Sequence, residues 1–202
     1  MIAIIAEKPS VGQEIARVVG ATEKKDGYIT GNGYMVTWAL GHLVSLALPG
    51  TYGYTRTTAE DLPMLPEPFR LVERQICTDR GMVTDIAAGK QLKIIDEVFS
   101  KCDSIIVATD AGREGELIFR WIYSHLAVPS LSNACGSPRL PTSIRKGMAD
   151  LREGHEYDSL YAAADSRAKA DWLVGMNASR AWRQPPVQRT TPSDGCRPRP
   201  SP

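Results

Sequence analysis

Two short aliphatic runs, each followed at once by acidic and basic side chains, are the strongest constraint that this sequence sets on its fold. Residues 1–6 (MIAIIA) and 104–108 (SIIVA) are almost wholly apolar. Such runs are typical of strands that are buried on both faces of a parallel sheet, because a half-exposed strand would alternate apolar and polar residues. A helical pattern follows each run. This strand-then-helix order predicts an α/β fold, with a mostly parallel, Rossmann-like sheet flanked by helices.

Helix signals appear at several places around this sheet. Ser10 and Gln13 have the capping-box spacing for a helix over residues 11–19, which Gly20 would end. Later segments with helical spacing are residues 85–100, 114–125, 143–152 and 157–181. In the first of these, the apolar side chains expected on one face are Ile86, Leu92, Ile95, Val98 and Phe99. The last two segments are expected to form a helical appendage outside the sheet domain.

Two segments carry turn signals. The pair Asn32-Gly33 predicts a hairpin turn that leads into a strand over residues 34–40. Residues 49–69 are rich in Pro, Gly and Thr, which indicates a long surface excursion and not a packed element.

The overall charge excludes a general attraction to nucleic acid. The chain has 24 Lys and Arg against 23 Asp and Glu, so a polyanion site must come from local clustering. From Ser166 onward there are seven basic residues and two acidic ones. The four cysteines form no C-x-x-C pair, which favours free thiols in a reducing cytoplasm over a zinc site. The apolar start is too short for a signal peptide or a membrane span.

Both aliphatic runs end in residues that can bind a metal ion and phosphate. Glu7 and Lys8 follow the first run, and residues 109–116 (TDAGREGE) follow the second. If the two strands are adjacent, these residues are neighbours at the carboxyl edge of the sheet, where open α/β sheets bind their ligands. An Asp, a glycine-containing turn and a Glu at a helix start bring together oxygen ligands that suit Mg²⁺ with several retained waters. Lys8 and Arg113 would contact a phosphate.

Each of these residues alone also has a purely structural interpretation. Asp110 has about even odds of being a helix N-cap, and Glu116 is expected to lie on a solvated helix face. The combination of two strand ends, each with an acid and a base, favours the functional interpretation.

At this point the residues match a known family. Residues 4–10 (IIAEKPS) together with 108–116 (ATDAGREGE) resemble the Toprim domain of type IA DNA topoisomerases, and are most similar to the bacterial topoisomerase III kind. Further matches in the family's order are residues 41–44, 62–63 and 171–180 (DWLVGMNASR). The resemblance spans about residues 1–181. It implies an enzyme that nicks one DNA strand through a phosphotyrosine, passes another strand and reseals the nick.

The resemblance implies a role for each matching residue. Glu7 would be the acid near the scissile phosphodiester, either giving a proton to the leaving 3′ oxygen or helping to hold metal. Lys8 would stabilise the charged phosphoryl transition state. Asp110 and Glu114 would hold Mg²⁺ with Glu7 close by. Arg113, the third catalytic candidate after Glu7 and Lys8, would bind phosphate or fix the carboxylates.

The implied partner is single-stranded DNA, with no nucleotide cofactor and no membrane. Lys8, Arg113, Arg167 and Arg180 would contact its phosphates without reading bases. On a helix of about 3.6 residues per turn, Arg167 and Arg180 lie about 140° apart and cannot both face one strand squarely, so we expect Arg167 and Lys169 to be partly solvent-facing and Arg180 to lie closer to the DNA.

Three residues call for separate treatment. The commoner family pattern is D-x-D-x-E, and Gly112 stands where the second Asp would be, which predicts weak Mg²⁺ binding. His42 matches a family position, but a lone His after an apolar strand is more often a packing residue. Tyr54 begins a Y-x-R-T sequence that superficially resembles the family's nucleophile motif. We reject it because it lies in the excursion, far ahead of the metal motif, and we expect no nucleophilic tyrosine in this chain.

The sequence departs from the family after Ala181. Permitted codons for residues 190–200 can be chosen so that a shifted reading frame encodes the expected Y-S-L-G-R-V-Q-T-P-T motif, which indicates a frameshift. Codons for residues 135–141 can likewise be chosen so that a shifted frame encodes R-L-S-S-L-T, which is similar to a strand of the family. We therefore expect a Toprim metal and phosphate domain over residues 1–141, the start of a helical single-stranded-DNA-binding domain over 142–182, and a disordered, out-of-frame tail over 183–202. Competing hypotheses are another Toprim enzyme, nuclease or primase-like, and a non-catalytic DNA-binding module.

Overall fold

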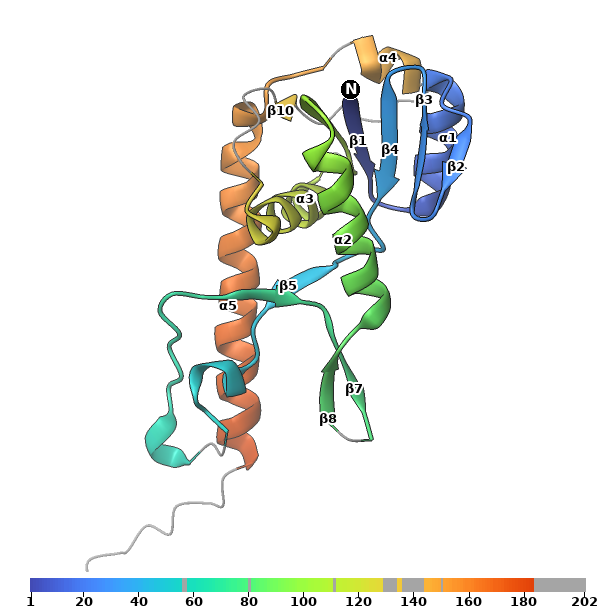
Figure 1. The fold of residues 1–202 in the computed structure, drawn as a ribbon. Helices are drawn as coiled ribbons and strands as arrows, with labels where there is room; N and C mark the ends of the chain where they lie inside the picture. Colours follow the sequence, from blue (N-terminus) through green and yellow to red (C-terminus); the bar gives the residue numbers. More distant parts are fainter. Residues whose placement is uncertain are drawn as a thin grey trace, which may run out of the picture.

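A six-stranded sheet forms the centre of the computed structural model, which describes residues 1–55, 58–79, 81–110, 112–128, 134–135, 144–149 and 151–183. The strand order is β10-β9-β1-β4-β3-β2. The strands span Ile2–Ala6 (β1), Glu23–Lys25 (β2), Tyr28–Gly31 (β3), Tyr34–Trp38 (β4), Ser104–Ala108 (β9) and Ala134–Cys135 (β10). β1 pairs in parallel with β4 on one side and with β9 on the other, whereas β2 and β3 are antiparallel (Figure 1). The predicted α/β fold with a largely parallel sheet is confirmed.

Helices cover both faces of the sheet because both faces of its central strands are apolar. Along β1, Ala3 and Ile5 belong to the core beneath α2 (Ile86–Ser100) and α3 (Arg113–Leu126). Ile4 and Ala6 belong to the opposite core, beneath α1 (Pro9–Val19) and α4 (Ile144–Ala149). These four β1 side chains are fully buried, as the unbroken aliphatic run predicts.

The helix after β1 begins earlier than the capping-box spacing predicts. α1 starts at Pro9, its N-cap is Lys8, and no side chain caps it. Pro is favoured at the first helical position because its missing N–H would have no intrahelical partner there. Gly20 ends the helix in the left-handed conformation, as expected.

The hairpin between β3 and β4 follows the sequence prediction. Asn32 and Gly33 both have positive φ, 49° and 82°, which a tight two-residue hairpin turn requires. The next strand, β4, then lies beside β1 and becomes part of the parallel half of the sheet.

A smaller part of the molecule lies beyond the carboxyl edge of the sheet. It contains β5 (Val44–Leu46) paired with β6 (Leu71–Glu73), and the hairpin of β7 (Gln75–Thr78) and β8 (Gly81–Thr84). Between β5 and β6 the excursion forms two 3₁₀ turns, Pro49–Tyr52 (η1) and Ala59–Asp61 (η2).

The interpretation of the excursion as wholly unpacked is wrong at Met64. This side chain is fully buried, and its backbone N–H donates to Asn177 Oδ1 at 2.6 Å. Asn177 Nδ2 donates in return to the Met64 carbonyl at 3.1 Å. One amide side chain therefore satisfies both backbone groups of Met64 and joins the excursion to the last helix.

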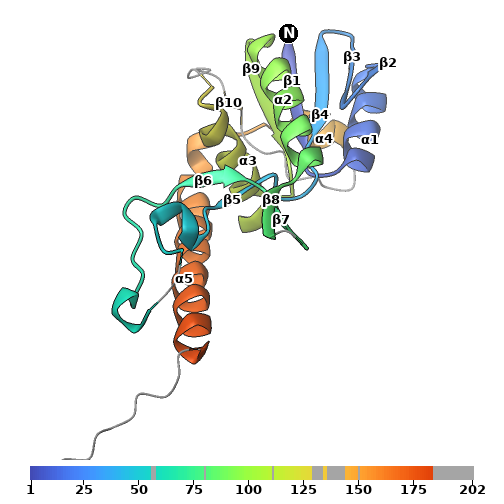
Figure 2. The same cartoon turned by 60° about the horizontal axis from the view of Figure 1, so that its bottom comes forward.

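The last described helix, α5 (Asp158–Arg183), runs beside α3 and extends well past the sheet (Figures 1 and 2). It follows the short 3₁₀ turn η3 (Gly154–Tyr157). Trp121 of α3 donates its indole N–H to Asp165 at 3.1 Å, and Trp172 donates its own to the Ala47 carbonyl at 3.0 Å. α5 is thus fixed to both parts of the molecule.

Some sequence predictions were wrong or lie beyond the described residues. Ile86, expected on the buried face of its helix, is 87% exposed because it stands in the first turn, past the end of the core. The tail expected over residues 183–202 lies outside the described residues except for Arg183, which ends α5. The second suspected frameshift, at residues 135–141, lies outside them except for Cys135, which ends β10. No helix in the described part of the chain is long and apolar enough to cross a membrane.

Candidate phosphate and metal site at the carboxyl edge of the sheet

Three neighbouring strands deliver the predicted site residues to one edge of the sheet. Ala6, the last residue of β1, is in register with Ala108 of β9 and with Trp38 of β4. Glu7 therefore leaves the sheet at the same edge as Thr109 and Asp110, as expected for adjacent parallel strands, and at the same edge as the segment that carries His42. The Ala39 N–H donates to the Ala6 carbonyl at 2.8 Å, which continues the pairing of β1 and β4 to this edge.

Glu7 and Lys8 form a close acid and base pair at the end of β1. Lys8 Nζ lies 3.6 Å from Glu7 Oε1. The Glu7 side chain is only 15% exposed, whereas that of Lys8 is 61% exposed. The carboxylate is thus sheltered at the edge while the ammonium group is available to an approaching anion.

Two helix N-termini without side-chain caps begin at this edge. α1 starts directly after Glu7 and Lys8, and α3 starts after Asp110 with Gly112 as its N-cap. Neither N-cap residue supplies a side-chain hydrogen bond to its helix. The N-cap alternative for Asp110 is therefore wrong. Helix N-termini attract anions through free N–H groups and the helix dipole, so the edge suits phosphate.

Backbone packing fixes the turn between Asp110 and α3. A Cβ atom on Gly115 would lie 2.1 Å from the Asp110 carbonyl oxygen, so only glycine permits the helix to approach the strand end so closely. The same carbonyl accepts the Gly112 N–H at 2.7 Å. Gly112 itself has open space around its missing Cβ, and its φ of −143° is open to any residue.

His42 belongs to this site. Its Nε2 lies 3.3 Å from Glu114 Oε2, and its ring packs edge-on against Trp121 at 6.1 Å between centroids. The loop that carries His42 is held by Arg74, whose Nη1 donates to the carbonyls of Leu40 and His42 at 2.9 and 3.2 Å. The imidazole thus packs against α3 and contacts Glu114 at the sheet edge.

Arg74 was missed by sequence reasoning. Its Nη2 lies 2.7 Å from Asp85 Oδ2, while Asp85 Oδ1 caps α2 by accepting from Ala87 and Ala88. Arg74 and these cap hydrogen bonds lower the pKa of Asp85, with Arg74 the larger cause. A local sequence pattern could not predict this arrangement, because Arg74 and the carbonyls that it binds are more than 30 residues apart in the chain.

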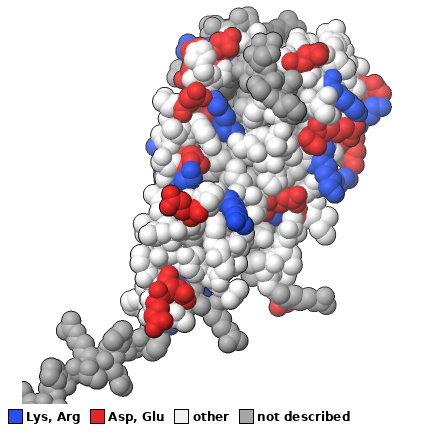
Figure 3. Space-filling model, turned by 60° about the vertical axis from the view of Figure 1, so that its left-hand side comes forward, with Lys and Arg blue, Asp and Glu red and all other residues white. Residues whose placement is uncertain are grey.

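The other sequence candidates divide into paired and unpaired groups. Arg113 is exposed at the start of α3, and the described residues place no carboxylate within ion-pair distance of it, which leaves it open to a phosphate. On α5, Arg167 Nε lies 3.6 Å from Asp171 and Lys169 Nζ lies 2.5 Å from Asp165. Figure 3 shows the left-hand side of the molecule as seen in Figure 1. Basic and acidic groups are interspersed on this face, and it has no broad basic surface.

The expectation that Glu116 faces solvent is wrong. Glu116 is 4% exposed, and its Oε1 accepts from Arg120 Nε at 2.8 Å. Arg120 Nη2 continues to the Gly154 carbonyl and to Asp158 Oδ1, both at 2.8 Å, so Glu116 lies beneath the start of α5. Burial raises the pKa of Glu116, and Arg120 opposes that rise.

The oxygen ligands for a metal are present but not gathered. Glu7, Asp110 and Glu114 are carboxylates, as Mg²⁺ prefers. However, within the described ranges no three His, Cys, Asp or Glu side chains are grouped as they would be around a metal ion. Glu114 instead lies against His42, so a cation would have to draw the carboxylates together.

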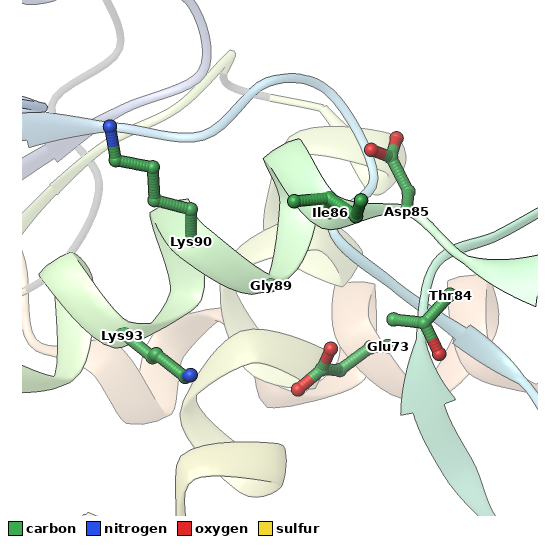
Figure 4. Close-up of a pocket in the computed structure, with 7 residues that line it drawn as sticks. All are labelled: Glu73, Thr84, Asp85, Ile86, Gly89, Lys90 and Lys93. Atoms are coloured by element: carbon green, nitrogen blue, oxygen red, sulfur yellow. The ribbon is translucent and has the colours of Figure 1, made fainter.

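A separate cavity of about 330 Å³ beside α2 is a poorer candidate (Figure 4). Its charged lining residues are Glu73, Asp85, Lys90 and Lys93. Asp85 is committed to Arg74 and the helix cap, and Lys90 Nζ lies 2.7 Å from Asp26. The remaining pair, Glu73 and Lys93, has no net charge to offer an ionic ligand.

The fold and this edge define the class of protein. Residues 2–140 match the family model of the Toprim domain, and the chain belongs to the Toprim family.

Comparison with individual proteins narrows the similarity from the Toprim domain to one kind of enzyme. The chain is 44% identical over 185 residues to DNA topoisomerase 3 of Shouchella clausii and 43% identical over 183 residues to that of Bacillus subtilis. These matches cover 89% and 88% of this chain but 24% of each relative, so the chain spans about a quarter of their length. Among solved structures, full-length topoisomerase I of Thermotoga maritima matches 90% of the chain and 26% of its own, with a TM-score of 0.55 at 19% identity, which supports the fold.

Proposed function

We propose that this chain is the phosphodiester-handling part of a type IA DNA topoisomerase of the topoisomerase 3 kind. The observation that carries the proposal is the meeting of Glu7, Lys8 and Asp110 at one sheet edge where two uncapped helices begin. The similarity to DNA topoisomerase 3 continues past the Toprim match into α5, which disfavours an unrelated Toprim nuclease or primase.

The side chains at the edge divide the chemistry of strand cleavage between them. Lys8 and Arg113 bind the phosphodiester and offset the charge that develops on its oxygens. The N-termini of α1 and α3 add backbone N–H groups to the same task. Glu7, sheltered beside Lys8, gives a proton to the departing 3′ oxygen and takes it back on resealing.

Mg²⁺ is the metal that we propose for this edge. Asp110 and Glu114 would hold it, with Glu7 nearby, and the ion would neutralise phosphate charge. With Gly112 in the place of a second Asp, the site has few carboxylates and the affinity is low. His42 acts as a positioning residue, because its contact at 3.3 Å holds the otherwise exposed Glu114 side chain at the edge.

Single-stranded DNA is the proposed partner, bound through phosphates with strong salt dependence. We assign residues 1–141 to the Toprim part and 142–182 to the start of a DNA-binding helical part. No nucleotide cofactor is required, since the reaction conserves bond energy in a tyrosine ester. We place the protein in the cytoplasm, together with its DNA.

A domain exchange tests the proposal. Residues 1–183 replace the matching quarter of Bacillus subtilis DNA topoisomerase 3, and relaxation of negatively supercoiled plasmid is measured with Mg²⁺. We expect relaxation by the exchanged protein and its loss in the Glu7→Gln version. A folded exchanged protein that is no more active than its Glu7→Gln version would refute the proposal.

A further inference from the structure

A buried hydroxyl group at the carboxyl edge of the sheet lacks a hydrogen bond. Thr109 directly follows β9 and precedes Asp110, and it is fully buried. Among the described residues, its Oγ1 is the one buried side-chain oxygen or nitrogen atom without a hydrogen-bond partner. A hydroxyl group that is removed from water and left unpaired destabilises the folded state, so its presence at this edge calls for a reason.

Thr37 shows how a hydroxyl group with a structural role is bonded in the same sheet. It lies in β4, and its Oγ1 donates to the Gly27 carbonyl at 3.0 Å and accepts from Gln91 Nε2 at 3.3 Å. Thr37 and Thr109 are both 0% exposed. The two threonines therefore differ in their partners and not in their burial, which makes Thr37 a matched reference for Thr109.

The start of α3 closes Thr109 off from solvent. A Cβ atom on Gly115 would lie 2.9 Å from the backbone nitrogen of Asp110, so the first turn of α3 packs against the peptide bond between Thr109 and Asp110. Because the Thr109 side chain has no exposed surface, a partner for its hydroxyl group must come from the sheet edge itself.

Glu7 is the polar side chain that the register of the sheet brings to the level of Thr109. In the parallel pair of β1 and β9, Ile5 is opposite Val107, and Glu7 and Thr109 stand two residues further along each strand. Ile5 and Val107 both belong to the core beneath α2 and α3. Because side chains alternate along a strand, Glu7 and Thr109 continue on that same face.

The carboxylate of Glu7 is also incompletely paired. Its side chain is 15% exposed, and its ion-pair contact in the described part of the chain is Lys8 Nζ at 3.6 Å, which is longer than a hydrogen bond. Lys8 is 61% exposed, so a bound phosphate can draw it away from Glu7. The sheltered carboxylate then lacks its counter-charge, while Thr109 offers a hydroxyl donor at the same edge.

We propose that Thr109 is a positioning residue for Glu7. When Lys8 turns to a bound phosphate, the Thr109 hydroxyl group donates a hydrogen bond to one oxygen of the Glu7 carboxyl group, and the other oxygen faces the departing 3′ oxygen. The inference rests on the proposed function, in which Glu7 gives a proton to that oxygen. The unpaired hydroxyl group gains its partner only in this state, so the interaction favours the reacting edge over the empty one.

Urea unfolding of the full chain tests the empty state. Thr109→Val keeps the branched shape and removes an unpaired hydroxyl group, so it should raise the unfolding midpoint by roughly 0.5 M. Thr37→Val is the matched control, and it should lower the midpoint because it breaks the bonds to Gly27 and Gln91. A midpoint that falls in both variants would show that the Thr109 hydroxyl group is already bonded, and would overturn the proposal.

Single-turnover cleavage tests the reacting state, in the exchanged topoisomerase described above. The affinity for a single-stranded oligonucleotide and the rate of its cleavage are measured separately. Thr109→Val should keep the affinity and slow cleavage about tenfold, as expected for one lost hydrogen bond to a charged group. Thr109→Ser retains the hydroxyl group and should restore the rate, which a purely structural role of the side chain does not predict.

The outcomes separate this inference from the proposed function. Cleavage at the unchanged rate in Thr109→Val, a loss of affinity in place of rate, or cleavage that stays slow in Thr109→Ser would overturn the role of Thr109 alone. An exchanged protein with Thr109 intact that is no more active than its Glu7→Gln version would overturn the proposed function, and this inference with it.

Discussion

Gly115 and Asp110 share space that leaves no room for a side chain: a Cβ on Gly115 would lie 2.1 Å from the Asp110 carbonyl oxygen. The strand end that carries Asp110 and the helix that carries Glu114 are therefore held by a backbone contact. Substitution of Gly115 by Ala must push them apart, and we expect it to destabilise the fold by roughly 1–3 kcal/mol, the usual cost of overpacking. Urea unfolding measures this. Gly112→Ala is the matched control, since its surroundings are open, and an equal loss in both variants would show that the contact is not the cause.

The open surroundings of Gly112 allow a gain of metal affinity. Gly112→Asp adds a carboxylate at the position where the commoner family pattern has one, without steric conflict. Because each added carboxylate strengthens a hard-cation site, we expect Mg²⁺ to bind on the order of tenfold more tightly. Calorimetric titration compares it with Gly112→Asn, which has the same shape without the charge. If the Asn variant gained as much as the Asp variant, the side chain would not be a ligand.

The pair of Glu116 and Arg120 predicts an unusual dependence of stability on pH. The folded pKa of Glu116 is raised by burial, so the native state holds this proton more tightly than the unfolded chain does. The Glu116 contribution to stability is then greatest at low pH and is lost as pH rises from about 4.5, the unfolded value, through the folded pKa. Glu116→Gln should remove that loss, so its unfolding free energy relative to wild type should rise over this window. A difference independent of pH would contradict the burial of an ionisable Glu116.

Removing the partner of Glu116 should be more damaging than removing Glu116 itself. Arg120→Met leaves a carboxylate that is 4% exposed without its ion pair and also removes the contacts to Gly154 and Asp158. We expect a loss of about 3 kcal/mol, near the lower end for broken buried pairs because Arg120 keeps 24% of its side chain exposed. Chemical denaturation at pH 7 measures it, with Arg167→Met as the exposed control. A loss no larger than in the control would show that the network does not hold α5.

The chain alone is expected not to relax supercoiled DNA. Relaxation needs a nucleophile whose oxygen takes over the phosphate. Tyr54 is the tyrosine whose neighbours in sequence most resemble the family's nucleophile motif, but it lines a cavity beside Arg180 and does not lie at the end of β1 or β9. Purified protein is incubated with negatively supercoiled plasmid and Mg²⁺, and the products are separated after treatment with detergent and protease. Relaxed topoisomers that disappear in Tyr54→Phe would show that Tyr54 is a working nucleophile.

The meeting of the site residues at one sheet edge could be predicted from sequence because it depends on local patterns. The buried strands are continuous aliphatic runs, and the residues after them reach one edge whenever the strands are parallel neighbours. The errors arose where distant residues decide the environment. Glu116 is buried beside Arg120, which reaches Asp158 at the start of α5, and Met64 is hydrogen-bonded by Asn177, which lies 113 residues further along the chain. Ile86 has the correct helical spacing, but the core ends before it.

The central claim, a metal-dependent phosphate site at the carboxyl edge of β1 and β9, is tested most directly by Mg²⁺ titration of two aspartates that bracket β9. Asp110 follows this strand and Asp103 precedes it, so Asp103 lies at the opposite end of the same element. Calorimetry on wild type should detect weak binding, which Asp110→Ala abolishes and Asp103→Ala preserves. Unchanged Mg²⁺ binding in Asp110→Ala would remove Asp110 from the site and contradict the account.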